Sequence, residues 1–241
     1  MWSDSAYAGE IYKYRKKQSI EYLSKGAFMY KTILFDLDGT LTDSGEGVKN
    51  GFIYALDKFG MTADKRDLDK VMGPPLYNSF REFFGLSHDD ANTAIKYYRE
   101  YYSDKGVFEN MLYEGIDTLL QKLKAQGKTV MVATSKPDFY AIPVLKMFNI
   151  FDYFDFVSAA TLDGRLSKKS DIVKIAIENA NCDKSEILMV GDRHHDVDGA
   201  KENGIDSLGV LYGYGDKAEM ERAGANFICE SVDELSKFFK L

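Results

Sequence analysis

The sequence contains little cysteine, no long apolar run and no excess of positive charge, and each absence excludes a class of protein. Its only cysteines, Cys182 and Cys229, form neither a C-x-x-C pair nor the framework of a small disulfide-rich domain, so we expect reduced thiols. No apolar stretch approaches the roughly 18 residues that a membrane-spanning helix needs. The net charge of −7 disfavours nucleic acid or an anionic membrane as the main partner, although it leaves room for a small anionic substrate.

The rest of the composition is that of an ordinary globular protein. Hydrophobic residues make up 45% and charged residues 29% of the chain. The length of 241 residues suffices for one large domain or for a core with a smaller insertion. Residues 1–28 are polar and lack the apolar segment of a signal peptide, so we treat them as an N-terminal extension. We expect a cytoplasmic enzyme or binding protein, either a monomer or a homodimer.

Short apolar segments alternate with helical patterns along most of the chain. Such segments are typical of parallel strands buried on both faces, and their alternation with helices predicts a doubly wound, Rossmann-like α/β sheet. The expected strands are YKTILFDLD (30–38), TVMVAT (129–134), FDFVSA (154–159), EILMVGD (186–192) and SLGVLYG (207–213). The expected helices include residues 114–127, 168–180 and 231–239, the last beginning at Ser231 as a cap. Pro143 should kink its own helix or delay its start.

The pattern changes between Ser44 and Tyr113, where helical periodicities follow one another without a strand signal. Residues 48–60 carry one such periodicity, and residues 87–102 carry another that begins with Ser87 as a cap. A block this long is too large for a loop. We therefore expect an all-helical cap, residues 46–112, over the carboxyl edge of a core made of residues 29–45 and 113–241.

The segment FDLDGTLTDS (35–44) places two aspartates, Asp36 and Asp38, after the first strand. Residues i and i+2 of an extended segment point the same way, so both should lie at the carboxyl end of the sheet, where open α/β sheets bind ligands. Close carboxylates raise each other's pKa unless a cation lies between them. The hard divalent ion Mg²⁺ prefers such oxygen ligands and would relieve the repulsion. On its own, however, D-x-D is more often a solvated strand end.

Later polar residues at strand ends favour the functional interpretation over the solvated one. Thr134 and Ser135 end the second expected strand with hydroxyl groups suited to a phosphoryl oxygen. A lysine pair, Lys168 and Lys169, precedes a helix and offers a cation. GDRHHD (191–196) ends another strand with two more aspartates. Each signal is weak alone, but their order at successive strand exits and helix entries is specific.

The order DLDGTLTDS, VATS, Lys168-Lys169 and GDRHHD resembles the haloacid dehalogenase superfamily of phosphohydrolases, from about Met29 to the C-terminus. The helical insertion resembles the cap of its phosphoglycolate phosphatase-like members. The segments MGPPL (72–76) and SFREFFG (79–85) resemble cap segments of that group and of its 5′-nucleotidase-like relatives. The resemblance implies a Mg²⁺-dependent hydrolase of a small phosphorylated metabolite.

The resemblance also implies roles in the chemical step. Asp36 would attack phosphorus and form an aspartyl-phosphate, and Asp38 would act as general acid and base. Thr134 would bind the transferring phosphoryl group. Lys169 would neutralise its charge, and it is favoured over Lys168 by the spacing of the residues that follow.

The metal and substrate contacts follow from the same resemblance. Asp192 would hold Mg²⁺ together with the Asp36 carboxylate and the backbone carbonyl of Asp38, while Asp196 would brace the site without touching the metal. Ser135 and Arg81 are further candidates for substrate contacts.

A histidine pair, one lysine and two tyrosine pairs are more simply explained by structural or solvent-exposed positions than by a role in the site. His194 and His195 are more often solvent-facing in such a loop, and Lys136 is more often a surface lysine. The tyrosine pairs at 97–98 and 101–102 should pack within the cap.

The substrate and the reaction class keep alternatives open. A 5′-nucleotidase, a pyrophosphatase and a β-phosphoglucomutase-like phosphotransferase use the same chemistry. A phospho-accepting receiver-like signalling module also uses an aspartate, a hydroxyl and a lysine at strand ends, but Asp38 and the helical insertion argue against it.

Overall fold

The computed structural model describes residues 30–241. The expected N-terminal extension, residues 1–28, lies outside the described residues. None of the helices from residue 30 onward combines the length and the hydrophobicity needed to cross a membrane.

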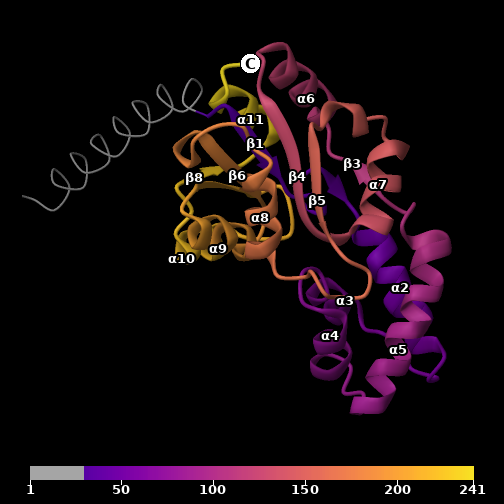
Figure 1. Cartoon of the computed structure of the whole chain (residues 1–241). Coiled ribbons are helices and arrows are strands. Elements are labelled where there is room, and N and C mark those ends of the chain that lie inside the picture. Colours follow the sequence, from indigo (N-terminus) through magenta and orange to yellow (C-terminus); the bar gives the residue numbers. More distant parts are fainter. Residues whose placement is uncertain (1–29) are drawn as a thin grey trace, which may run out of the picture.

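Six parallel strands form the central sheet of the described chain, in the order β5-β4-β1-β6-β7-β8 (Figure 1). Their bounds are β1 Thr32–Phe35, β4 Thr129–Pro137, β5 Phe156–Ala160, β6 Ile187–Gly191, β7 Asp206–Val210 and β8 Phe227–Cys229. The first strand is central, because the chain adds β4 and β5 on one side and then returns to add β6, β7 and β8 on the other. This reversal of strand order makes a topological switch point at the carboxyl end of β1, the place where open α/β sheets bind ligands.

The central strands β1 and β6 are buried on both faces, and side chains along β1 alternate between two apolar clusters. Ile33 and Phe35 belong to one cluster, and Leu34 belongs to the other. The first cluster includes residues of α6 (Ile116–Ala125), α7 (Asp138–Met147) and α11 (Val232–Phe238). The second includes residues of α8 (Lys169–Glu178) and α9 (His194–Asn203), and α10 (Lys217–Ala223) packs on α9. Helices therefore cover both faces, which confirms the predicted doubly wound sheet.

A helical insertion, defined here as residues 45–110, lies between two short strands. β2 (Thr42–Asp43) and β3 (Met111–Leu112) pair antiparallel and bring its two ends together. The insertion contains α2 Gly45–Asp57, α3 Lys65–Lys70, α4 Leu76–Glu82, α5 His88–Tyr101 and a π-helical turn, Tyr102–Gly106. Figure 1 shows these helices grouped beyond one end of the sheet, on the side to which β1 leads. The insertion is therefore positioned to contact whatever binds at the switch point.

Local signals in the sequence account for several of these helix boundaries. The side chains of Ser87 and Ser231 accept hydrogen bonds from the backbone N–H groups of Asp90 and Glu234, so both predicted N-caps are confirmed. Pro143 does not delay its helix, because α7 begins at Asp138 and continues past the proline. Short 3₁₀ turns occur at Phe151–Tyr153 and Lys184–Glu186.

Candidate active site

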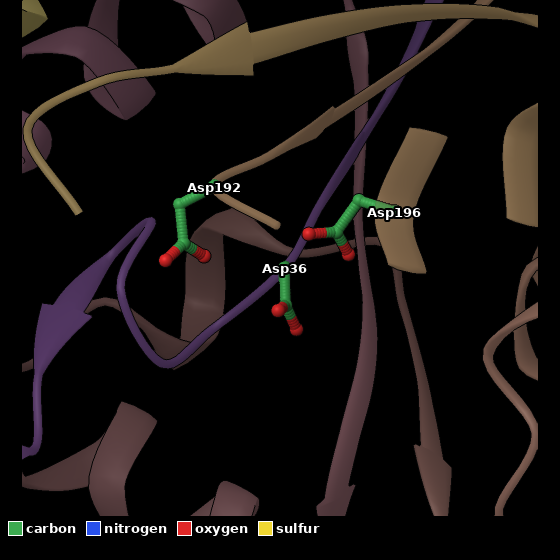
Figure 2. Close-up of side chains that lie close together, drawn as sticks. All are labelled: Asp36, Asp192 and Asp196. Atoms are coloured by element: carbon green, nitrogen blue, oxygen red, sulfur yellow. The ribbon is translucent and has the colours of Figure 1, made fainter. Parts of the chain in front are cut away.

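Three aspartates from three separate segments converge at the switch point. Asp36 directly follows β1, Asp192 directly follows β6, and Asp196 lies in the first turn of α9. One carboxylate oxygen from each residue lies within 4.8 Å of the other two. Figure 2 shows the three carboxylates directed toward one shared space. We call these residues the acidic cluster.

Asp192 is held rigidly and is inaccessible to solvent. Its Oδ1 accepts a hydrogen bond from the Thr40 hydroxyl at 3.1 Å, and its Oδ2 accepts one from the backbone N–H of Tyr214 at 2.9 Å. Gly39 turns the chain beside it with φ +85°, and a Cβ at Gly39 would overlap Asp192 Oδ2. The turn after β1 therefore needs glycine both for its left-handed backbone and for the space that the carboxylate occupies.

Asp196 reaches the cluster because its side chain folds back over the end of β6. Its Oδ2 accepts a hydrogen bond from the backbone N–H of Arg193 at 3.1 Å, which closes the first turn of α9. A Cβ at Gly191 would overlap the Asp196 side chain, so glycine at the end of β6 lets this carboxylate come close. The structure thus brings Asp196 directly into the cluster, where the sequence predicted only a supporting position.

Lys169 is the cation of the acidic cluster. Its ammonium lies 2.8 Å from Asp36 Oδ1 and 2.9 Å from Asp196 Oδ1, and it donates a hydrogen bond to the carbonyl of Ala133 at 3.1 Å. Its neighbour Lys168 points to solvent and pairs with Glu202 at 2.7 Å. The geometry therefore agrees with the preference for Lys169 over Lys168.

Burial and mutual repulsion shift the pKa values of the cluster. Burial raises the pKa of Asp36 to about 6 even though Lys169 opposes the shift, and Asp196 adds to it. Burial, Asp196 and Asp36 raise the pKa of Asp192 well above its usual range. The pKa of Lys169 lies above its ordinary value because the two carboxylates outweigh the effect of burial, so the lysine stays charged. With every carboxylate ionised, the cluster and its lysine keep two negative charges.

The donor set of the cluster fits a divalent metal. All three residues offer carboxylate oxygens, the hard ligands that Mg²⁺ prefers. Two of these oxygens, Asp36 Oδ1 and Asp196 Oδ1, are buried, touch Lys169 only as ion pairs and accept no well-aligned hydrogen bond. A buried polar atom without a partner is costly, and a cation would satisfy both oxygens while balancing the remaining charge.

Asp38 does not point its carboxylate into the acidic cluster. Both of its oxygens accept hydrogen bonds from Lys136 Nζ, at 3.0 and 2.9 Å, and the same ammonium donates to the hydroxyl of Tyr102 at 2.6 Å. The side chain of Lys136 is only 4% exposed, so the prediction of a surface lysine is wrong. Only the backbone carbonyl of Asp38 remains as its expected metal contact.

Lys136 is buried because β4 continues to Pro137, beyond the predicted strand end. The pairing of β4 with β5 is irregular between Thr134 and Pro137, so alternation along the strand did not predict the direction of the Lys136 side chain. Thr134 is buried, and its hydroxyl accepts a hydrogen bond from the backbone N–H of Lys136 at 3.1 Å. Ser135, between them, is exposed.

Two other candidate groups lie apart from the cluster. Arg81, on α4, is exposed and donates a hydrogen bond to the carbonyl of Leu86 within the helical insertion. The structure therefore does not bring Arg81 to the site. His194 contacts Glu219 Oε1 through its backbone N–H and its ring Nδ1, both at 2.8 Å. The structure thus gives His194 a role in holding the loop after Asp192.

A cavity of about 670 Å³ lies where the helical insertion meets the core, and none of the residues of the acidic cluster lines it. Arg193 borders it and donates a hydrogen bond across the junction to the carbonyl of Met72 at 2.6 Å. Its lining residues are Asp43, Gly45, Glu46, Lys49, Asp69, Lys70, Met72, Arg193 and Tyr214. Because both parts of the chain line it, the insertion can influence what enters.

Comparison with known proteins finds one matching family and relatives that are named for different activities. The family model described as haloacid dehalogenase-like hydrolase matches residues 33–210. A 5′-nucleotidase of Pseudomonas aeruginosa is 35% identical over 210 residues, 87% of this chain and 95% of its own. A Mycobacterium tuberculosis protein named tyrosine-protein kinase PtkA is 37% identical over 206 residues, 84% of this chain and 70% of its own. The crystal structure of a protein described as a predicted phosphatase from Clostridium acetobutylicum is 45% identical with a TM-score of 0.81, covering 88% of this chain and all of that one.

Proposed function

The chain belongs to the haloacid dehalogenase-like hydrolase family, and from that premise we propose that it is a Mg²⁺-dependent phosphatase that hydrolyses a small phosphomonoester through a phosphorylated Asp36. The observation that carries the proposal is the convergence of Asp36, Asp192 and Asp196 around Lys169 at the switch point of the sheet. Family membership agrees with the resemblance seen in the sequence, and the named relatives support phosphoryl chemistry.

In the proposed first step, a carboxylate oxygen of Asp36 attacks phosphorus as the bond from phosphorus to the leaving oxygen breaks. Asp38 gives its proton to that oxygen, so the product leaves as an alcohol. In the second step, the oxygen of a water attacks phosphorus, and the bond from phosphorus to Asp36 breaks. Asp38 accepts a proton from this water, which releases phosphate and readies Asp38 for the next cycle.

The surrounding residues lower the electrostatic cost of bringing one anion to another. Lys169 lies 2.8 Å from Asp36 and would stay near the phosphoryl oxygens during transfer. The hydroxyl of Thr134 would donate to one of those oxygens. Asp36, Asp192 and Asp196 would hold Mg²⁺ together with the Asp38 carbonyl. When bound, the metal supplies positive charge that stabilises the phosphoryl group in the transition state.

We further propose that residues 46–112 act as a cap on a core of residues 29–45 and 113–241. The bond from Arg193 to the Met72 carbonyl and the bond from Lys136 to Tyr102 join the insertion to the core beside the site. A cap held in this way would exclude bulk water during the first step and would select the leaving group.

The substrate class is best tested with nucleotides first. The relative named 5′-nucleotidase favours a nucleoside 5′-monophosphate over phosphoglycolate or pyrophosphate. Two other expectations, a cytoplasmic location and a monomeric or homodimeric state, rest on composition and stay predictions.

The test is phosphate release from p-nitrophenyl phosphate and from a panel of nucleoside monophosphates with Mg²⁺. We expect Asp36→Asn to abolish release, because the amide is a poor nucleophile, and we expect chelation of Mg²⁺ to do the same. Asp57→Asn is the matched control, since Asp57 is an exposed residue at the end of α2. Full activity of the Asp36→Asn protein would overturn the assignment of the nucleophile.

A further inference from the structure

Lys136 has no role in the chemistry described so far, yet it is one of the few charged side chains buried in the described chain. Burying a lysine is costly unless the charge is paired and its donors are satisfied. The three donors of this ammonium meet the two oxygens of Asp38 at 3.0 and 2.9 Å and the hydroxyl of Tyr102 at 2.6 Å. No donor is left for substrate, so Lys136 is not placed to bind the phosphoryl group.

The two partners of Lys136 come from different parts of the molecule. Asp38 belongs to the turn after β1, whereas Tyr102 is the first residue of the π-helical turn that follows α5 in the helical insertion. The Tyr102 ring is itself fixed, because it stacks on Tyr98 with ring centroids 5.3 Å apart and meets the edge of Tyr140 of α7 at 5.4 Å. Lys136 therefore joins the proposed acid/base to a rigid aromatic group of the insertion.

The turn that carries Asp38 does not by itself orient the carboxylate. Among the hydrogen bonds of the described residues, the Asp38 carboxylate has Lys136 as its donor, and the side chain is 29% exposed. An exposed aspartate samples several rotamers, whereas one held by two charge-assisted bonds keeps a single orientation.

We propose that Lys136 is a positioning residue that fixes the Asp38 carboxylate to accept the proton of the attacking water, and that Tyr102 of the helical insertion completes this clamp. The proposal rests on the proposed function above, because it needs an aspartyl-phosphate that water hydrolyses. Lys136 keeps its three protons throughout, and the proton of the water goes to Asp38. Contact with Tyr102 makes the clamp complete only when the insertion is in the position seen here.

The substrate p-nitrophenyl phosphate separates the two steps. Its leaving group departs as a stable anion, so formation of the aspartyl-phosphate, which kcat/KM reports, depends little on Asp38. Hydrolysis of the aspartyl-phosphate still needs Asp38 as a base, and this step limits kcat when Asp38 is misplaced. General-base catalysis typically contributes 10²- to 10⁴-fold, and loss of orientation should remove about tenfold to hundredfold of it.

The experiment measures kcat, KM and the pre-steady-state burst for the full chain carrying Lys136→Met. We expect kcat to fall about tenfold to hundredfold, KM to fall with it, kcat/KM to stay within about threefold, and a burst of p-nitrophenol to appear. Lys136→Arg, which keeps a charged donor, should recover part of kcat. Tyr102→Phe should lower kcat by a smaller factor while kcat/KM again stays nearly unchanged. Lys174→Met is the matched control, because Lys174 is an exposed lysine of α8.

A purely structural role gives a different result. A smaller folded fraction would lower kcat and kcat/KM equally, leave KM unchanged and produce no burst, and this outcome would overturn the proposal. In an Asp38→Asn background, Lys136→Met should cause no further loss of kcat, because the lysine acts through Asp38. A further loss of kcat would show that Lys136 acts through a residue other than Asp38, and it would also overturn the proposal. Absence of phosphate release by the unmodified protein would instead overturn the proposed function.

Discussion

Replacing Lys169 by methionine tests how much one buried charge contributes to the reaction. The substitution keeps most of the side-chain volume and removes the ammonium that lies 2.8 Å from Asp36 Oδ1. A phosphoryl group carried by Asp36 would bring its own oxygens close to the ammonium, and at about 4 Å a unit charge pair is worth roughly 4 kcal/mol at an effective dielectric near 20. Since about 1.4 kcal/mol corresponds to a factor of ten in rate, kcat/KM should fall about 10³-fold.

Lys168→Met is the matched control, because the two lysines are neighbours with opposite environments. Lys168 is 62% exposed and pairs with Glu202, whereas Lys169 is 7% exposed. The assay is p-nitrophenyl phosphate hydrolysis at saturating Mg²⁺, with circular dichroism to confirm folding, since removing one partner of a buried ion pair costs about 3–5 kcal/mol of stability. The Lys168→Met protein should keep nearly full activity. An activity loss smaller than tenfold for Lys169→Met, or an equal loss in both variants, would refute the reasoning.

Two further predictions concern the acidic cluster. Because burial raises the pKa of Asp36 from 3.8 to about 6 in the folded protein, folding takes up a proton between these values. The contribution of Asp36 to the free energy of unfolding in EDTA, measured as the difference between the unmodified protein and Asp36→Asn, should therefore fall as pH rises from about 4 to 6, by up to about 3 kcal/mol. Thermal unfolding of both proteins across this pH range checks the sign, and a difference that grows with pH would contradict it. Gly39→Ala should abolish activity because its Cβ would overlap the Asp192 carboxylate, whereas Gly60→Ala, at φ +66° with open space, should cost only about 1 kcal/mol of stability and keep activity. Equal activity of the two glycine variants would show that Asp192 tolerates displacement.

The sequence was sufficient to predict five of the six strands of the sheet and the edge at which Asp36 and Asp192 meet, because both depend on local patterns. The apolar runs mark β1, β4, β5, β6 and β7, and polar residues at their carboxyl ends must meet at one edge of a parallel sheet. The strand β8, Phe227–Cys229, was missed because three residues are too few to show a pattern.

The orientation of Asp38 was beyond the same reasoning. The rule that residues i and i+2 point the same way holds only within a strand, and β1 ends at Phe35. Asp38 lies in the turn that Gly39 continues with φ +85°, so its carboxylate meets Lys136 rather than the acidic cluster. Tyr102 was also unpredictable as its partner, because the contact joins the insertion to the core and depends on how the two pack.

Asp196 shows a third limit of sequence reasoning. Its place in the motif GDRHHD does not say whether the side chain supports the site or enters it. The outcome depends on the start of α9 at His194 and on the missing Cβ of Gly191, which together let the carboxylate fold back to the end of β6.

The most direct test of the account is a crystal structure of the protein soaked in Mn²⁺, a divalent ion with anomalous scattering and a similar preference for oxygen ligands. We expect one anomalous peak among the carboxylate oxygens of Asp36, Asp192 and Asp196, with the Asp38 carbonyl as a further ligand, and no such peak in the Asp192→Asn protein. An active protein whose crystals show no ion at the acidic cluster, or show it only elsewhere, would contradict the claim that these aspartates hold the metal of a phosphatase.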